Sequence, residues 1–110
     1  MLILFFLIVS CAGNCIIKIT TKQVSPDGKH LAIKHWQDCG AIANGQPQIS
    51  ILTLPDTLPE MYGNVVKDCY GIWIEKWLSN DTLLLKVTPG TKLNYTRNEF
   101  NGITILYSGN

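Results

Sequence analysis

Short apolar stretches separated by turn-forming residues are the feature that most restricts the fold. No segment shows the apolar spacing of a convincing helix, and the one helix-like window, residues 54–62, holds two prolines, which helix interiors do not tolerate. The pattern predicts an all-β fold of six or seven strands, mostly antiparallel, forming a small sheet or a β-sandwich. The expected strands are Ile16–Val24, Lys29–Trp36, Gln48–Leu54, a stretch from Val65 interrupted at Gly71, Thr82–Val87 and Gly102–Tyr107.

Alternation within these segments predicts which side chains form the core, because every second residue of a strand points to the same face. Turns between the segments are marked by the sequence Ser-Pro-Asp-Gly at 25–28, by Ser-Asn-Asp at 79–81 and by Pro-Gly at 89–90. The predicted core positions are Leu31, Ile33, Ile49, Ile51, Ile72, Ile74, Leu83, Leu85, Val87, Ile103 and Ile105.

The size and charge of the chain limit what it can do. A length of 110 residues suits one domain, which we expect to span residues 16–110. The formal net charge of +1 gives no electrostatic basis for binding nucleic acid. The sequence contains no Gly-x-Ser-x-Gly motif and no recognisable triad, so we expect no enzymatic activity and no catalytic residues.

The first ten residues are apolar from Leu2 to Val9. Eight apolar residues are too few for a membrane-spanning helix, which needs about 20. They suit the apolar region of a secretory signal, although no basic residue precedes the run. We therefore predict that residues 1–10 are a signal segment.

The sequence Ile8-Val9-Ser10-Cys11 resembles the lipobox of bacterial lipoproteins. The resemblance implies that Cys11 becomes the acylated first residue of the mature chain and that residues 11–15 form a lipidated tether. Two or more acyl chains hold a protein firmly on a membrane. Asn14 makes Cys15 the poorer candidate for lipidation. The alternatives are a buried N-terminal strand with structural cysteines and a soluble secreted form.

Four blocks of sequence occur in a fixed order: Ser-Pro-Asp-Gly-Lys at 25–29, Asp-Cys-Gly-Ala at 38–41, Gln-Ile-Ser-Ile-Leu at 48–52 and Trp-Leu-Ser-Asn-Asp-Thr-Leu-Leu at 77–84. Together they resemble the pattern of a family of small bacterial lipoproteins without an assigned activity. The first block, with the strand after it, also resembles the repeat hairpin of TolB-type β-propellers, but the chain is too short for a closed propeller. The resemblance to the lipoprotein family implies a location in the bacterial cell envelope.

The cysteines of an exported protein are expected to form disulfides. We predict a bond between Cys39 and Cys69, which leaves Cys15 as an odd thiol in the tether. The alternative is a metal site made of His30, His35, Cys39 and Cys69. It is disfavoured because His30 and His35 face opposite sides of the expected strand and no Cys-x-x-Cys pair is present. We therefore expect no metal and no cofactor, and we expect both histidines to be exposed polar residues.

Three tryptophans fall out of step with the aliphatic core positions of their strands. Trp36, Trp73 and Trp77 would form an aromatic surface for a glycan or a peptide, or else would be covered by a second layer. The expected function is that of an interaction module, anchored to the membrane, that binds an envelope protein or polymer through the tryptophan surface or through the loop at residues 38–47. The alternatives are a purely structural lipoprotein and a secreted metal-binding or enzymatic domain.

Overall fold

The computed structural model describes residues 15–39, 45–93 and 95–109. The expected signal segment and the proposed lipidation site, Cys11, lie outside the described residues. Within them the chain is all-β, with seven strands and no helix, as predicted. The strands are β1 (Ile16–Val24), β2 (His30–Asp38), β3 (Gln48–Thr53), β4 (Ile72–Ser79), β5 (Thr82–Val87), β6 (Glu99–Phe100) and β7 (Ile103–Gly109).

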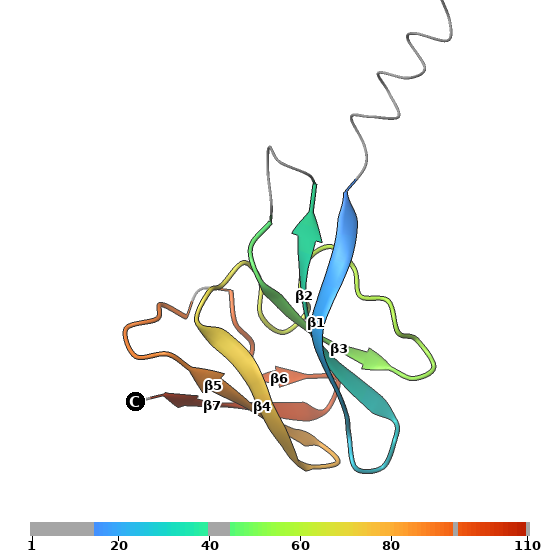
Figure 1. The fold of residues 1–110 in the computed structure, drawn as a ribbon. Helices are drawn as coiled ribbons and strands as arrows, with labels where there is room; N and C mark the ends of the chain where they lie inside the picture. Colours follow the sequence, from blue (N-terminus) through green and yellow to red (C-terminus); the bar gives the residue numbers. More distant parts are fainter. Residues whose placement is uncertain (1–14, 40–44, 94, 110) are drawn as a thin grey trace, which may run out of the picture.

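The strands form two sheets (Figure 1). The first has the order β1-β2-β3 and the second has the order β4-β5-β7-β6, so β1 and β4 are both edge strands. The two edges meet where the Trp77 indole Nε1 donates a hydrogen bond of 2.9 Å to the Gln23 carbonyl oxygen. The Gln23 side chain in turn donates to the Glu75 carbonyl oxygen at 3.1 Å. From this point the strands diverge toward their N-terminal ends (Figure 1).

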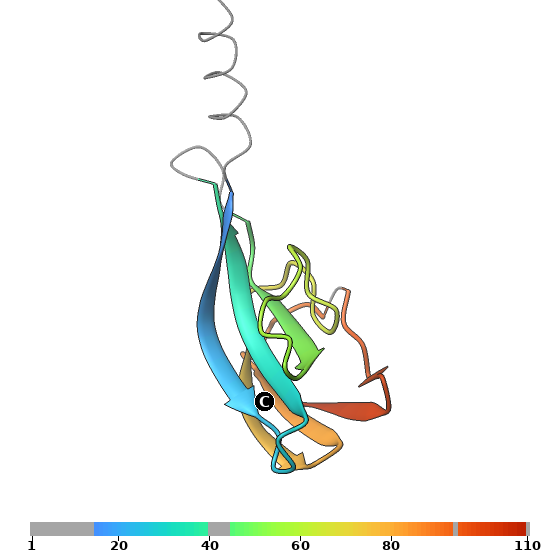
Figure 2. The ribbon, with the colours of Figure 1, turned by 90° about the vertical axis from the view of Figure 1, so that its right-hand side faces the viewer.

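The turn between β1 and β2 is stabilised by its own polar side chains. The Asp27 carboxylate accepts hydrogen bonds from the Ser25 hydroxyl at 2.6 Å and from the Lys29 amide at 3.1 Å. These bonds, with the Ser25 hydroxyl foremost, hold the pKa of Asp27 below its ordinary value. Gly28 has a φ of +75°, which glycine adopts without steric cost. The turn predicted at 25–28 is confirmed, and it produces the long β1–β2 hairpin seen in Figure 2.

One strand pair is parallel, within a fold that is otherwise antiparallel, as expected. β5 and β7 are parallel, with Thr82 opposite Thr104 and Val87 opposite Gly109. Parallel neighbours require a crossover connection rather than a tight turn. Residues 88–102 supply it, and within them β6 forms an antiparallel pair with β7.

Residues 65–71 link the two sheets rather than forming the start of a strand. Val66 forms isolated bridges to Ile49 of β3 and to Thr96, which precedes β6. Gly71 has a φ of +83°, and β4 begins at the next residue. The interruption expected at Gly71 is therefore present, and residues 65–71 belong to the connection between β3 and β4.

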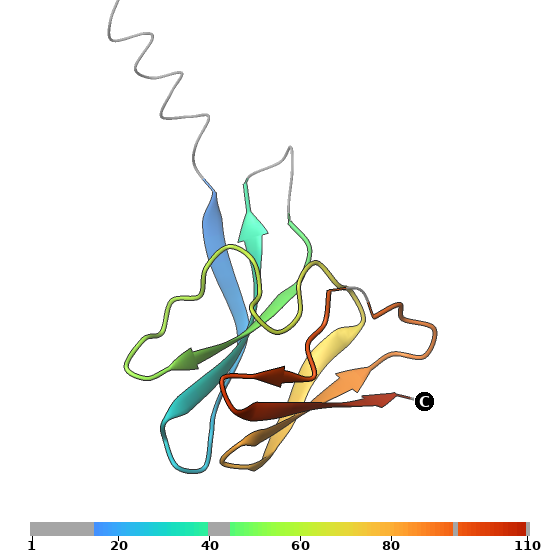
Figure 3. The same ribbon diagram turned by 180° about the vertical axis from the view of Figure 1, so that it is seen from behind.

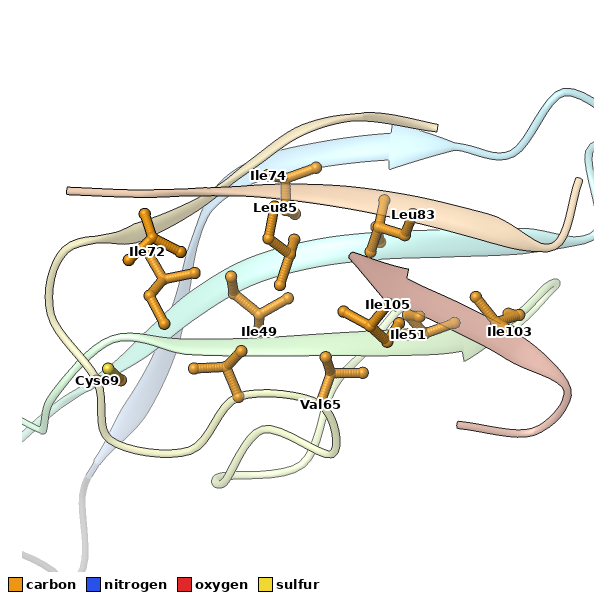
Figure 4. Packing of buried hydrophobic residues seen from close by; sticks show 13 residues of the cluster. Ile49, Ile51, Val65, Cys69, Ile72, Ile74, Leu83, Leu85, Ile103 and Ile105 are labelled. Carbon is orange, nitrogen blue, oxygen red and sulfur yellow. The ribbon is translucent and has the colours of Figure 1, made fainter. Parts of the chain in front are cut away.

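The core lies between the two sheets (Figure 4). Ile49 and Ile51 of β3 face Ile74, Leu83 and Leu85 of the four-stranded sheet, and Cys69 closes one end. All the predicted core residues are buried. Leu31 and Ile33 nevertheless lie outside this cluster, which contains their neighbour Ala32 instead. β2 is therefore buried on both faces.

The segment between β3 and β4 crosses the first sheet on the face seen from behind (Figure 3). The Asn64 side chain binds the Ile51 backbone like a neighbouring strand, accepting from its amide at 2.8 Å and donating to its carbonyl oxygen at 2.9 Å. The Asn64 amide donates to the Ser50 hydroxyl at 3.3 Å. The segment thus provides a cover for the second buried face of β2.

Candidate functional site

A disulfide joins Cys15 to Cys39. It closes the open end of the β1–β2 hairpin, directly beyond the pair formed by Ile16 and Asp38. The predicted bond between Cys39 and Cys69 is therefore wrong, as is the placement of Cys15 as an odd thiol. A disulfide indicates an extracytoplasmic, oxidising location, because such bonds are rare in the reducing cytosol.

Cys69 is a free, buried cysteine. Its thiol is part of the core and lies 3.3 Å from the Lys92 carbonyl oxygen, to which it donates. The sequence did not reveal this, because an aspartate precedes both Cys39 and Cys69 and nothing local separates a strand-end cysteine from a core cysteine.

Two of the three singled-out tryptophans line one pocket. Trp36 of β2 and Trp73 of β4 lie on its walls, together with Tyr70 and Thr21. Its volume of about 670 Å³ lies within the range typical of sites for small ligands. We call it the tryptophan pocket, and it is lined by Thr20, Thr21, Lys34, His35, Trp36, Gly45, Pro47, Tyr70, Trp73 and Ile74.

The pocket arises from the alternation of β2 and the divergence of the two sheet edges. Ala32, Lys34 and Trp36 share one face of β2, and Ala32 belongs to the core. Farther along the same face, Lys34 and Trp36 line the pocket instead. Across from them, Trp73 lies on the face of β4 opposite to its buried neighbours Ile72 and Ile74 and is 38% exposed. The pocket therefore lies on the same face of β2 as the core, farther along the strand, where the second sheet no longer covers that face.

A β-bulge shapes the wall that β1 contributes. The register between β1 and β2 shifts between Ile19 and Thr21, so Thr20 is an extra residue. Its hydroxyl donates a hydrogen bond of 3.2 Å to the Lys34 carbonyl oxygen. Along its other edge, within the described residues, β1 pairs with no further strand.

Among the described residues that line the pocket, Lys34 is the only charged one, apart from the titratable His35. Its ammonium nitrogen lies 6.0 Å from the centre of the Trp73 ring, and burial lowers its pKa below the ordinary value. Among the described residues the one ion pair joins Lys18 and Asp38 at 3.3 Å. All eight acidic residues of the chain are described, and no Asp or Glu carboxylate lies within ion-pair distance of Lys34.

Trp77 does not belong to the pocket. Its ring packs against the core cluster and its indole nitrogen binds β1 through Gln23. The expected surface of three tryptophans is therefore replaced by a pocket with two, and Trp77 is a structural contact between the two sheet edges.

His35 is fully buried, so the expectation that it is exposed is wrong. Its Nε2 lies 2.8 Å from the Ser50 hydroxyl, and its buried Nδ1 has no hydrogen-bond partner. Burial lowers the pKa of His35 from 6.5 to about 4. The imidazole is therefore neutral at pH 7. By strand alternation it lies on the face of β2 opposite to Lys34 and Trp36.

The metal site considered as an alternative is not assembled. Cys39 is consumed by the disulfide, and His35 is bound to Ser50. In the described part of the chain no group of three or more His, Cys, Asp or Glu side chains is placed to hold a metal ion.

A second cluster of aromatic and basic residues was not predicted. The Lys67 ammonium lies 4.7 Å from the centre of the Tyr62 ring and 5.7 Å from that of Tyr95. Both rings are exposed, and the neighbouring Arg97 helps line a smaller pocket of about 290 Å³. The two tyrosines are distant in sequence and lie in connections, where no periodic pattern signals a shared position.

Lys34 and Tyr70 are among the pocket residues that the sequence did not single out. Lys34 carried a usable signal, because it shares a strand face with Trp36, whereas Tyr70 lies in a connection and carried none. Within the described ranges, no helix has the length and apolar character needed to cross a membrane. Comparisons of the chain with protein-family models, with curated proteins and with solved structures find no match.

Proposed function

We propose that this protein is a bacterial envelope lipoprotein, anchored through Cys11, whose domain binds an envelope protein or polymer in the tryptophan pocket. The observation that carries the proposal is the convergence of Trp36 and Trp73, from two different sheets, on one pocket with Lys34. An aromatic wall beside a cation without an acidic partner is a recognition surface for a ligand that supplies the missing charge.

A purely structural role accounts less well for these residues. Trp73 leaves 38% of its surface exposed, and Lys34 loses solvation without gaining a carboxylate. Partly burying a charge without pairing it costs free energy. A ligand that contacts both residues would offset that free-energy cost. A protein with a purely structural role would instead be more stable with other residues at these two positions.

The anchor is supported by the resemblance of residues 8–11 to a lipobox and by the disulfide, which indicates an oxidising location. Intact-mass measurement of the protein from the membrane fraction tests it. We expect the loss of residues 1–10 and the gain of acyl mass at Cys11. Reduction should then add the mass of two hydrogens for one disulfide. An unacylated chain that retains residues 1–10 would refute the anchor.

Photo-crosslinking in the native host tests the binding function without a known ligand. Trp73→benzoylphenylalanine places the reactive group at the pocket, and Leu106→benzoylphenylalanine places it on the outer face of β7, at a similarly exposed site. We expect adducts of defined mass from position 73 and none from position 106. The yield of the adduct at position 73 should fall when Lys34→Met is introduced into the same protein.

Equal labelling at both positions, or no adduct at position 73, would remove the tryptophan pocket as the binding site. Circular dichroism of both labelled proteins checks that each remains folded.

A further inference from the structure

The tryptophan pocket lies beside an unpaired strand edge. Thr20 and Thr21 belong both to the pocket wall and to β1, whose outer edge has no partner strand among the described residues. Such an edge presents backbone amide and carbonyl groups to which an extended peptide can add as a further strand.

Two hydrogen bonds close the space beside this edge at one end. The bonds from Gln23 to Glu75 and from Trp77 to Gln23 hold β1 and β4 together at one end. An added strand could therefore follow β1 from the diverging end and would have to stop before these contacts. A chain that enters in this way ends within the pocket.

The charge at the pocket fits the terminus of such a chain. Lys18 lies 5.8 Å from the Trp36 ring centre but is already paired with Asp38 at 3.3 Å. Lys34 lies 6.0 Å from the Trp73 ring centre and has no carboxylate within ion-pair distance among the described residues. Of these two lysines, Lys34 alone has no carboxylate partner that competes with an incoming anion, and the indole rings beside it can contact an apolar group.

We propose that the tryptophan pocket captures the C-terminus of an extended peptide. The terminal carboxylate binds the Lys34 ammonium, the last side chain packs on Trp36 and Trp73, and the peptide backbone adds to the free edge of β1. The inference rests on the proposed function, because it names the ligand class of the same site.

Calorimetric titration of the full chain in detergent tests this proposal. The probes are N-acetylated tripeptides with Ala, Leu, Phe or Trp at the C-terminal position, each prepared as the free acid and as the C-terminal amide. We expect the best acid to bind at least about tenfold more tightly than its amide, since a hydrogen bond to a charged group contributes that much or more.

Two lysine variants separate the pocket charge from the general charge of the protein. Lys34→Met keeps the side-chain length and should weaken binding of the acid about tenfold, while binding of the amide changes by less than about twofold. Lys22→Met removes the same charge from the opposite face of β1, next to Ile33 in register, and should leave both affinities unchanged.

Three results would overturn the proposal. Acid and amide could bind equally, with both weakened by Trp73→Ala. That result rejects the carboxylate and leaves the pocket function standing. Phenylpropionate, an aromatic acid without a peptide backbone, could bind as tightly as the best tripeptide, which rejects the strand edge. Absence of binding by every tripeptide rejects a peptide terminus, and photo-crosslinking from position 73 then decides independently whether the pocket binds anything.

Discussion

At the scale of single residues, His35 links stability to pH. Its pKa is about 4 in the folded protein and about 6.5 when solvated. Between these values the unfolded chain binds more protons, so the free energy of unfolding falls as the pH drops from 6.5 through 4. The full loss is about 3 kcal/mol. Urea titrations at pH 7, 5.5 and 4.5 should show most of this loss, and His35→Gln should flatten the dependence on pH. An equal slope in both proteins would contradict this account.

Gly63 is constrained by its neighbours and not by its dihedral angles. A Cβ at this position would contact the Val66 carbonyl oxygen and would lie 2.6 Å from the Ile49 carbonyl oxygen. Both are backbone atoms, one in the link between the sheets and the other in β3, so Gly63→Ala should lower the free energy of unfolding by about 3 kcal/mol or more.

The matched control for Gly63 is Gly102→Ala. Gly102 has a φ of +80° with open space around its Cβ position, so this substitution should cost only about 1 kcal/mol. Thermal unfolding monitored by circular dichroism measures both variants. A smaller loss of unfolding free energy for Gly63→Ala than for Gly102→Ala would contradict this account, because it would mean that the backbone around Gly63 can move to accommodate a Cβ.

At the scale of elements, the disulfide determines how firmly the β1–β2 hairpin is closed. Cys15 and Cys39 are 24 residues apart, and closing a loop of that length stabilises the fold by about 3 kcal/mol in the loop-entropy model. Cys15→Ser, Cys39→Ser and the double variant should therefore lose the same amount, because each removes the same bond. Denaturant unfolding measures the losses, with Cys69→Ala as the variant outside the bond.

Peptide mapping provides an independent check of the same pairing. The protease digest should contain one cross-linked pair of peptides, with Cys15 and Cys39, and an unlinked peptide with Cys69. Alkylation of Cys69 should require unfolding, since its thiol is buried. A cross-linked peptide containing Cys69 would contradict the structure.

At the scale of the whole molecule, the core joins both sheets into one unit. Ile51 belongs to the first sheet and Leu85 to the second, and both are part of a single buried cluster. Ile51→Ala and Leu85→Ala should each lower the free energy of unfolding by about 2–5 kcal/mol. Near- and far-ultraviolet circular dichroism should give coincident transitions in both variants. Leu106→Ala, on an exposed position, should change little, and separate transitions for the two sheets would contradict a shared core.

The strand pattern was predictable because alternation and turn residues act locally. Ile72, Ile74, Leu83 and Leu85 alternate, and their burial followed directly. The parallel pairing of β5 with β7 was not predictable, because it depends on where a connection with weak local signals returns. The prediction of the disulfide pairing was wrong for a similar reason. Cys15 and Cys39 are recognised as neighbours only once the hairpin register is known. In the site, Trp36 and Trp73 stood out from the aliphatic pattern, but only the packing shows that Trp77 is excluded.

The position of the disulfide limits how far the domain can move if Cys11 is acylated as proposed. Three residues separate Cys11 from Cys15, and a fully extended chain covers at most about 3.6 Å per residue. The tether can therefore reach at most roughly 14 Å. Bonding of Cys15 to Cys39 prevents β1 from peeling away to lengthen it. The protein would therefore sample only the layer next to the lipid headgroups. Reduction of this one bond would extend its reach without releasing it from the membrane.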